Sequence, residues 1–426
     1  MVPTILNTFS SRLLITLFNF LIVIGISRIL GPDGKGQATL IITSIFMILF
    51  FCNIMSGRAL IYLIPRYSPS SLIIPAYLWC VVISIIARGL MHITPWLNSA
   101  FVPHVFLLSL LYGLLHTHLM VLAGKERIYF HNTLNVLQIA LTLIGLAVSF
   151  YVVGYRSIFA YIYSLYGSFL LTLLVSFGAI YPYWRAISFT STKNRIRESV
   201  SFGSHYQFYE IMQLLNFRFA FYVLEAWHGE DVLGIYSIGV SLLEAAWLFG
   251  RSVSFVQYTR IANYQDALAT RLLTLRLAKM SLIISGIGIL VLLIMPTSLY
   301  TFIFGEAFSN IKDYMKWLMP GILVYSPALA VTNYFAGLGR YRVNIVGAFL
   351  GFICTLLFSY TLIPGFAMSG AGLTATISFT VTTAFLLWQF QRRAAFAIAD
   401  YIPKWHDVTI LKQELIKVLK GVRYKQ

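Results

Sequence analysis

Two long apolar runs, Leu13 to Ile26 and Leu40 to Met55, flank a short polar segment near the start of this sequence. With its flanking residues, each run is about 15–25 residues long, which as a helix spans a hydrocarbon core about 30 Å thick. The segment between them, Ser27 to Thr39, contains three glycines and a proline and is too short for a domain. It therefore predicts a tight turn that joins two membrane-spanning helices.

The composition extends this prediction to the whole chain. Hydrophobic residues make up 59% of the sequence and charged residues only 11%, whereas charged residues are about a quarter of an ordinary soluble domain. The apolar runs predict an all-α polytopic membrane protein with about twelve transmembrane helices. The predicted spans are residues 6–27, 38–63, 72–93, 101–122, 132–153, 157–180, 205–226, 233–256, 277–298, 314–336, 343–363 and 369–391.

The distribution of basic residues predicts the orientation in the membrane. Lysine and arginine outnumber aspartate and glutamate by 31 to 14, which gives a formal net charge of +17. In a soluble protein this balance would suggest a nucleic-acid partner. With the N-terminus placed in the cytoplasm, 22 lysines and arginines fall on the cytoplasmic side and six on the opposite side. By the positive-inside rule both termini are expected in the cytoplasm, and the charge reflects topology, with no nucleic-acid partner.

Two pairs of similar turns indicate an internal repeat. Residues Gly31–Gly36, before the second span, resemble Gly229–Gly234, before the eighth, at an offset of 198 residues. Residues 123–127 similarly resemble residues 336–340. Each pair is six spans apart, so the halves have the same orientation and are related by an axis along the membrane normal. The predicted parts are an N-terminal six-helix bundle (1–180), a basic cytoplasmic linker (181–204), a C-terminal six-helix bundle (205–391) and a basic cytoplasmic tail with an amphipathic helix (392–426).

Ionisable residues inside the predicted spans are candidates for the functional site. Each costs about 2.5–3.5 kcal/mol to insert into lipid, so those present face a protein interior or a water-filled path. Glu210 and Arg218 are eight residues apart in the seventh span, about 80° around a helix. Glu244 and Arg251 are seven residues apart in the eighth span, within about 20°. Each of these helices therefore presents an acid and a base on one side.

Two interpretations of these charges stay open. In the first, the acids and arginines neutralise one another between packed helices. In the second, the arginines line a hydrated cationic cavity that binds an anionic head group, because arginine forks match phosphate oxygens. For Arg58, late in the second span, snorkelling to the cytoplasmic boundary is a further alternative. The predicted substrate-binding residues are Arg58, Arg218, Arg251, Gln213 and Asn216, and the predicted coupling or charge-pairing residues are Glu210 and Glu244.

Motifs typical of enzymes and cofactor sites are absent from the sequence. It contains no GxxxxGK[ST] pattern, so the chain is not expected to bind ATP in a P-loop. It contains no HExxH or GxSxG pattern, and its three cysteines lie in apolar runs without metal-ligand spacing. The sequence therefore predicts no catalytic residue, no metal site and no bound cofactor, and it favours a transporter that a proton or sodium gradient could drive.

Two segments carry a resemblance to a known family. Residues Arg28–Gly36 (RILGPDGKG) and Ala59–Arg66 (ALIYLIPR), within twelve spans arranged in two halves, resemble the O-antigen/polysaccharide flippases. These belong to the multidrug/oligosaccharidyl-lipid/polysaccharide exporter superfamily. The sequence departs from the pattern at Lys35, where an apolar or aromatic residue is more typical.

The resemblance implies a function and a location. Such proteins move an undecaprenyl-pyrophosphate-linked oligosaccharide from the cytoplasmic to the periplasmic leaflet of the bacterial inner membrane. The resemblance also implies two bundles that rock about a central cationic cavity, coupled to an ion gradient. The implied partners are the polyprenyl-pyrophosphate-linked oligosaccharide, the lipid bilayer, a glycan polymerase and a chain-length regulator.

Three other functions are weighed against this one. A drug/cation antiporter of the same superfamily would be expected to carry acids in its cavity, whereas the spans here are net cationic. A lipid II flippase usually has two additional spans. A membrane enzyme of surface-glycan assembly, a polymerase or ligase, would need a long aqueous loop, and the longest non-cytoplasmic segment expected here is only about residues 299–313.

Overall fold

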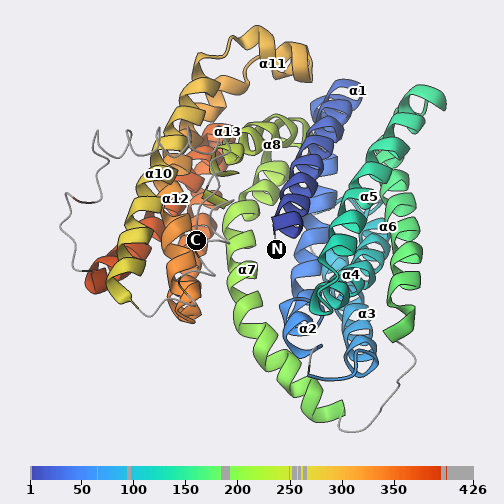
Figure 1. Cartoon of the computed structure of the whole chain (residues 1–426). Helices are drawn as coiled ribbons and strands as arrows, with labels where there is room; N and C mark the ends of the chain where they lie inside the picture. The colour runs from blue at the N-terminus through green and yellow to red at the C-terminus, as the bar shows by residue number, and fades with distance from the viewer. Residues whose placement is uncertain are drawn as a thin grey trace. The chain divides into compact units, whose positions relative to one another are not determined.

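The computed structural model is helical throughout the residues it describes. These are 2–64, 66–93, 97–183, 192–248, 250–251, 257, 261, 266–394 and 400, and no strand occurs among them. The first half contains α1 (Val2–Ser56), α2 (Arg58–Leu63), α3 (Ser70–Ile93), α4 (Val102–Gly124), α5 (Ile128–Ala147) and α6 (Ile158–Ile180) (Figure 1). The second half contains α7 (Thr192–His228), α8 (Glu230–Glu244), α10 (Ala267–Ile294), α11 (Thr297–Phe304), α12 (Ile311–Gly337) and α13 (Tyr341–Ala394).

The first predicted turn is formed by one non-helical residue inside α1. Gly31 has φ 71° and ψ −169°, a conformation essentially restricted to glycine, and it divides α1 into two helical arms. Pro32 follows at the start of the second arm, where its fixed φ suits a helix and its missing N–H leaves no bond unmade. Residues 33–37 are helical, so the turn between the first two spans is present but shorter than the sequence suggested.

The long helix α13 is divided in a similar way. Ala367 has φ 47° and ψ −126°, which a residue with a Cβ atom rarely adopts, and it separates the segments predicted as the last two spans. A Cβ atom added at Gly370 would collide with the carbonyl oxygen of Leu362. Glycine at this position therefore allows the two arms to approach closely beside the turn.

Seven helices of the described residues are long and apolar enough to cross a membrane, and two of these are the divided helices α1 and α13. The chain is therefore a multi-pass membrane protein, as predicted. The predicted spans 205–226 and 314–336 lie on α7 and α12, and the span 233–256 begins on α8, which ends at Glu244. None of these three helices is among the seven. The count of twelve crossings and the cytoplasmic location of the termini stay predictions. The predicted tail helix lies outside the described residues.

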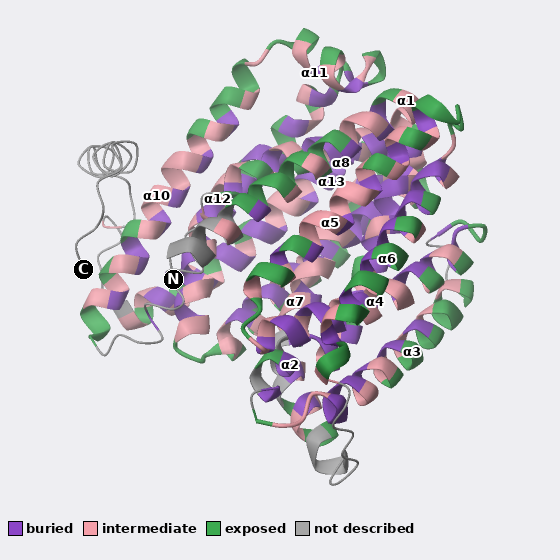
Figure 2. Cartoon of the chain, turned by 45° about the vertical axis from the view of Figure 1, so that its right-hand side comes forward, coloured by how far each residue is buried: buried purple, intermediate pink, exposed green. Residues whose placement is uncertain are grey.

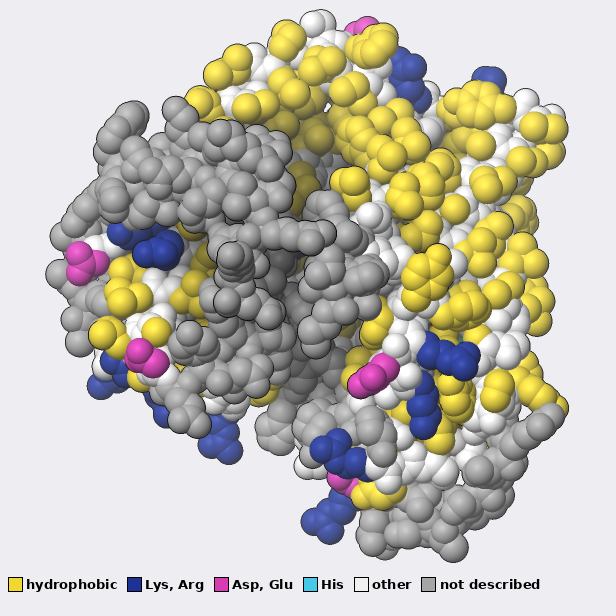
Figure 3. Space-filling model, viewed as in Figure 1, with side chains coloured by type: hydrophobic (Ala, Val, Ile, Leu, Met, Phe, Trp, Pro, Cys, Tyr) yellow, Lys and Arg dark blue, Asp and Glu magenta, His cyan; other side chains and the backbone are white. Residues whose placement is uncertain are grey.

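The surface of the helices fits a hydrocarbon environment. On α3, Leu78, Ile86 and Ile93 have exposed fractions of 63%, 52% and 81%, and exposed residues follow this helix along its length (Figure 2). In the space-filling view, hydrophobic side chains cover the middle of the visible right-hand face, and the Lys and Arg side chains on it lie toward the helix ends (Figure 3). An apolar middle with charged ends is the pattern that a lipid-facing surface requires.

The chain divides into two compact units that are interleaved along the sequence. Unit 1 comprises Met1–Leu214, His228–Ser237 and Tyr300–Phe308, and unit 2 comprises Leu215–Trp227, Ile238–Leu299 and Ser309–Gln426. Helix α7 contributes to both units. Of the predicted linker, residues 181–183 form a short 3₁₀ helix after α6, and residues 192–204 form the first turns of α7. The predicted limits of the two six-helix bundles stay a prediction.

One cluster in the core of unit 1 is built from α2 to α6, and α1 also buries apolar side chains such as Ile41 and Ile45 in this unit. The buried side chains of the cluster come from all five helices and include Leu63, Ile73, Leu119, Leu134 and Ile180. One polar group crosses this interior: His118 contacts the hydroxyl of Ser176 through Nδ1 at 2.6 Å and the hydroxyl of Tyr77 through Nε2. A buried histidine with partners on neighbouring helices is typical of helix–helix hydrogen bonding in membrane proteins.

The core of unit 2 contains an aromatic cluster around Trp247. The rings of Phe217, Tyr325 and Phe379 lie 5.6, 5.0 and 5.8 Å from the Trp247 ring, measured between centroids. Trp247 is fully buried, and its Nε1 donates a 2.8 Å hydrogen bond to the carbonyl oxygen of Ile322. The indole is therefore fixed in position on all sides.

Within unit 1, the two repeated turns pack directly against each other. A Cβ atom added at Gly36 would collide with the carbonyl oxygen of Glu230, and one added at Gly234 would collide with the carbonyl oxygen of Pro32. Gly36 and Gly234 are equivalent positions of the repeat, and so are Pro32 and Glu230, at the same offset of 198 residues. The contact is therefore reciprocal, as expected for two copies of one motif related by a local twofold axis.

Side chains next to this contact follow the same symmetry. Thr39 and Ser237 are also equivalent positions, and the Thr39 hydroxyl donates to the Ser237 hydroxyl at 3.1 Å. The buried Lys35 ammonium donates to both, at 2.6 Å to Thr39 and 3.0 Å to Ser237. Lys35, the position at which the sequence departs from the family pattern, therefore holds the two turns together.

Candidate functional site

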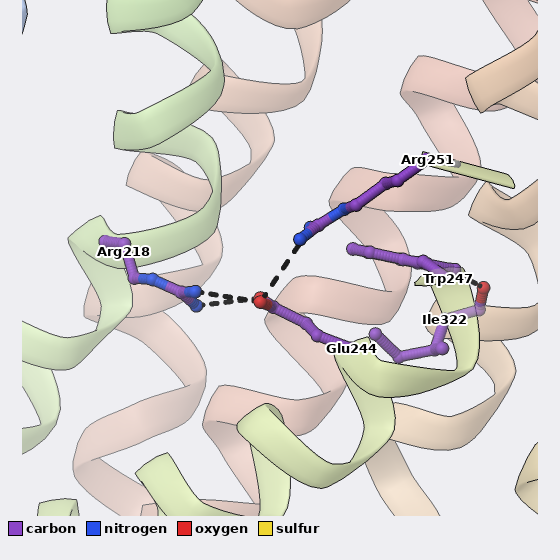
Figure 4. Close-up of polar contacts among 5 residues, drawn as sticks. All are labelled: Arg218, Glu244, Trp247, Arg251 and Ile322. Atoms are coloured by element: carbon purple, nitrogen blue, oxygen red, sulfur yellow. Dashed lines mark hydrogen bonds and ion pairs between the residues drawn. The ribbon is translucent and has the colours of Figure 1, made fainter. Parts of the chain in front are cut away.

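Three of the predicted site residues meet in unit 2. Arg218 of α7 donates two hydrogen bonds to Glu244 at the end of α8, at 2.8 Å to Oε1 and 2.9 Å to Oε2. Arg251 approaches the same carboxylate from another direction, with Nη2 3.9 Å from Oε2 (Figure 4). We call these three residues the arginine–glutamate cluster. Arg218 and Glu244 are linked by the bidentate geometry that makes arginine–carboxylate pairs strong.

The structure keeps one of the two acid–base groupings that the sequence suggested, Glu244 with Arg251, and gives Arg218 a different partner. The helical spacing grouped Glu210 with Arg218 and Glu244 with Arg251, as an acid and a base on the same helix. In the structure the bidentate pair joins different helices, because Arg218 binds Glu244. Groups eight residues apart on one helix are separated by about 12 Å along its axis, too far for a direct ion pair.

Aromatic rings support both arginines. The guanidinium of Arg251 lies 5.5 Å from the centroid of the Trp247 ring, and that of Arg218 lies 5.1 Å from the Phe221 ring. Such cation–π contacts are worth about 0.5–2 kcal/mol, and more as the cation is removed from water. The sequence analysis missed both aromatic residues, although an aromatic residue three or four positions from an intramembrane arginine is a signal that could have found them.

The cluster carries an excess of positive charge in a partly dry environment. The Glu244 side chain is 12% exposed and Arg218 is 24% exposed, whereas Arg251 is 50% exposed. Two arginines share one carboxylate, so the cluster has a net charge of +1 when all three groups are ionised. A surplus cation with low surrounding dielectric attracts an anion more strongly than the same cation in water. The arrangement is suited to hold a phosphate or carboxylate.

Asn216, another predicted substrate-binding residue, contacts the helix α13. It is 2% exposed, its Oδ1 accepts hydrogen bonds from Thr355, at 2.8 Å, and from Ser378, and its Nδ2 lies 3.5 Å from the hydroxyl of Thr382. These partners lie on both arms of α13, and Gly351 leaves the space that the amide occupies. The Asn216 side chain therefore joins packed helices of unit 2, and its predicted role in substrate binding stays a prediction.

The other predicted residues belong to unit 1, whereas the cluster belongs to unit 2. Glu210 and Gln213 are half-buried on the part of α7 that belongs to unit 1, and each has polar contacts of its own. Arg58 begins α2, directly after the helix break at Gly57, and its side chain lies outside the described ones. Their predicted roles in coupling and in substrate binding stay predictions.

Comparison with known proteins places the chain in a family. The model of the family described as polysaccharide biosynthesis protein matches residues 4–256, which is more than half of the chain. The chain belongs to this family. The capsular polysaccharide biosynthesis protein CapF of Staphylococcus aureus is 28% identical over 159 residues, which cover 37% of this chain and 40% of CapF. The similarity thus spans less than half the length of that curated relative.

Solved structures of membrane transport proteins share the fold. The lipid II flippase MurJ, in an inward closed conformation, has a TM-score of 0.75 and 14% identity, covering 100% of this chain and 94% of MurJ. An inward-facing multidrug resistance MATE transporter of the MOP superfamily has a TM-score of 0.67 and 14% identity, covering 92% of this chain and 98% of its own. At these identities the likeness shows the fold, and it confirms the predicted fold class.

Proposed function

We propose that this protein is a flippase that moves a polyprenyl-pyrophosphate-linked oligosaccharide, the repeat unit of a surface polysaccharide, across the bacterial inner membrane. Membership of a polysaccharide biosynthesis family and a multi-pass helical fold support this proposal. A protein of similar fold is named as a flippase of lipid II. Transport by alternating access, coupled to a proton or sodium gradient, is part of the proposal, as are a glycan polymerase and a chain-length regulator as partners.

The observation that carries the proposal is the arginine–glutamate cluster. A polyprenyl-pyrophosphate-linked oligosaccharide bears negative charge on its pyrophosphate whatever its sugars are, and its polyprenyl chain is neutral. A net-positive cluster with an accessible guanidinium, Arg251, matches that charge and the fork geometry of phosphate oxygens. A carrier of cationic drugs would favour the opposite charge, so the cluster supports an anionic substrate.

Complementation of a flippase-deficient host tests the proposed function. The chain is expressed in a strain that lacks its own O-antigen flippase, and both surface glycan and lipid-linked repeat units are measured. We expect the wild-type chain to restore surface glycan and to reduce the lipid-linked repeat units that accumulate inside. The strain should offer repeat units from several polysaccharides in turn, because substrate range differs between flippases.

Two outcomes would reject the proposal. One is that deletion of the chain from its own host leaves surface glycan intact without accumulation of lipid-linked units. The other is that expression lowers the accumulation of cationic dyes in cells while glycan export stays unchanged, which would favour a drug/cation antiporter. Protein levels in the membrane fraction are measured in every strain, so that loss of export is separated from loss of protein.

A further inference from the structure

The three charges of the arginine–glutamate cluster are bound unequally. The two hydrogen bonds from Arg218, at 2.8 and 2.9 Å, use both carboxylate oxygens of Glu244. The 3.9 Å from Arg251 Nη2 to Oε2 exceeds hydrogen-bond length, and no hydrogen bond from Arg251 is present among the residues that the structure describes. Arg218 is therefore committed to Glu244, whereas Arg251 is attracted to the carboxylate through its charge and keeps its N–H donors for a ligand.

Arg251 nevertheless has a defined position. Its guanidinium lies over the ring of Trp247, which is fully buried and anchored by the 2.8 Å hydrogen bond to Ile322. An arginine that is half exposed but held over a fixed ring loses less conformational entropy on binding than a freely rotating one. The side chain thus combines accessibility with a fixed direction, which an anion-binding residue requires.

From this geometry we propose that Arg251 contacts the pyrophosphate of the lipid carrier and that Glu244 is the resident counter-ion which the pyrophosphate replaces at Arg251. Arg218 and Trp247 are positioning residues: Arg218 holds the carboxylate and Trp247 holds the guanidinium. This assignment rests on the proposed function. It gives the same cluster two neutralised states, one with carboxylate and one with phosphate beside Arg251.

The exchange has a physical advantage for a transporter. A guanidinium without any counter-ion in a partly dry site would bind phosphate tightly and release it slowly, because separation would leave an uncompensated charge. Glu244 remains within 3.9 Å of Arg251 and compensates that charge when the ligand leaves. The carboxylate therefore weakens binding to the level at which a carrier can both load and unload its substrate.

Binding of a short lipid pyrophosphate to the purified full-length protein tests the assignment. The probe is farnesyl pyrophosphate, with farnesol as the uncharged control, and affinity is measured by isothermal titration calorimetry in detergent. We expect Arg251→Gln to weaken pyrophosphate binding about tenfold to hundredfold, the range for a lost charge-assisted contact, and Arg251→Lys to weaken it less. Glu244→Gln should strengthen binding severalfold, because the competing carboxylate is gone.

A neutral double variant separates the roles of the two arginines and guards against misfolding. Arg218→Gln combined with Glu244→Gln removes both charges of the bidentate pair, so neither is left buried and unpaired. We expect this double variant to bind pyrophosphate more tightly than wild type, and addition of Arg251→Gln to abolish the gain. Lys316→Gln, which removes an exposed lysine paired with Asp313, is the control for net charge and should not alter binding.

The outcomes distinguish the assignment from the proposed function. If the double variant binds as weakly as Arg251→Gln, Arg218 itself contacts the ligand and the assignment is wrong. If the wild-type protein does not prefer farnesyl pyrophosphate to farnesol, the cluster is not a pyrophosphate site, even when complementation supports a flippase. If pyrophosphate binds as expected but no host is complemented, the flippase proposal fails while the binding assignment stands.

Discussion

Replacing Gly36 by alanine tests the contact between the two repeated turns of unit 1. The added Cβ atom would collide with the carbonyl oxygen of Glu230, which is backbone and cannot rotate away as a side chain can. The turns would have to separate by roughly 1 Å or more to restore ordinary non-bonded distances. At that separation the 3.0 Å bond from Lys35 to Ser237 and the 3.1 Å bond from Thr39 to Ser237 would break.

The expected destabilisation follows from these contacts. Overpacking of a well-packed site costs about 1–3 kcal/mol, and each lost hydrogen bond costs about 1 kcal/mol. Gly36→Ala is therefore expected to lower the free energy of unfolding of unit 1 by about 3–5 kcal/mol. Gly234→Ala should have a similar effect, because its Cβ atom would collide with the carbonyl oxygen of Pro32.

Thermal unfolding with a thiol-reactive fluorophore measures this effect in the purified protein. Cys52 and Cys80 are fully buried in the same unit, so they react only when it opens. The variants are compared at one heating rate, since membrane proteins often unfold irreversibly. The matched control is Gly167→Ala on α6, where a Cβ atom would meet nothing within 4 Å, and we expect it to unfold at the wild-type temperature or slightly above.

The double variant provides a second criterion. Once one alanine has separated the turns, the second Cβ atom no longer collides with the opposite backbone. The double variant Gly36→Ala with Gly234→Ala should therefore lower the free energy of unfolding little more than either single change. Fully additive effects would show that the two positions are independent. Alanine variants that unfold at the temperature of the Gly167→Ala control would show that the reciprocal contact does not exist.

Three further predictions concern other parts of the chain. Ala367→Gly should raise the unfolding temperature of unit 2, measured by scanning calorimetry, because it removes strain at φ 47° that is worth about 1 kcal/mol or more. Arg218→Gln should destabilise unit 2 by about 2 kcal/mol, less than for a fully buried pair because Arg218 is 24% exposed, and a second change, Glu244→Gln, should recover most of it. Glu230 lies outside the predicted spans, and burial raises its pKa above the ordinary value of 4.5. The hydrogen bond that Gln37 donates to its carboxylate lowers the pKa, but by less than burial raises it. Because the folded protein then holds this proton more tightly than the unfolded one, stability should fall as pH rises from 4.5 through the raised pKa, and Glu230→Gln should flatten that part of the stability–pH profile measured by thermal unfolding.

The sequence predicted which residues form the candidate site better than it predicted which of them pair. Arg218, Glu244 and Arg251 were identified because charges inside apolar runs are costly, and the structure brings these three together. Asn216 met the same criterion of polarity inside a span but serves helix packing. A sequence shows that a polar group is buried in a span, but not whether its partner is a neighbouring helix or a ligand, because both satisfy the same hydrogen bonds.

The repeat shows a similar division. The sequence contains the signal for the whole contact, since Thr39 and Ser237 have the same 198-residue offset as the matched glycines. It does not show that the two copies touch. Only the structure shows that Gly36 leaves space for the carbonyl group of Glu230, that Gly234 leaves space for the carbonyl group of Pro32, and that the Lys35 ammonium donates to both hydroxyls.

The sequence by itself determined that the chain lies in lipid, that its secondary structure is helical and where a helix reverses direction. Long apolar runs force the backbone to satisfy its own hydrogen bonds in lipid, which leaves helices, and glycine with proline marks where a helix must reverse, as at Gly31. The tertiary structure decided which charges pair and which stay accessible. Arg218 and Arg251 are the same residue type in the same kind of span, and only the position of one carboxylate, Glu244, makes the first a fixed partner and leaves the second exposed.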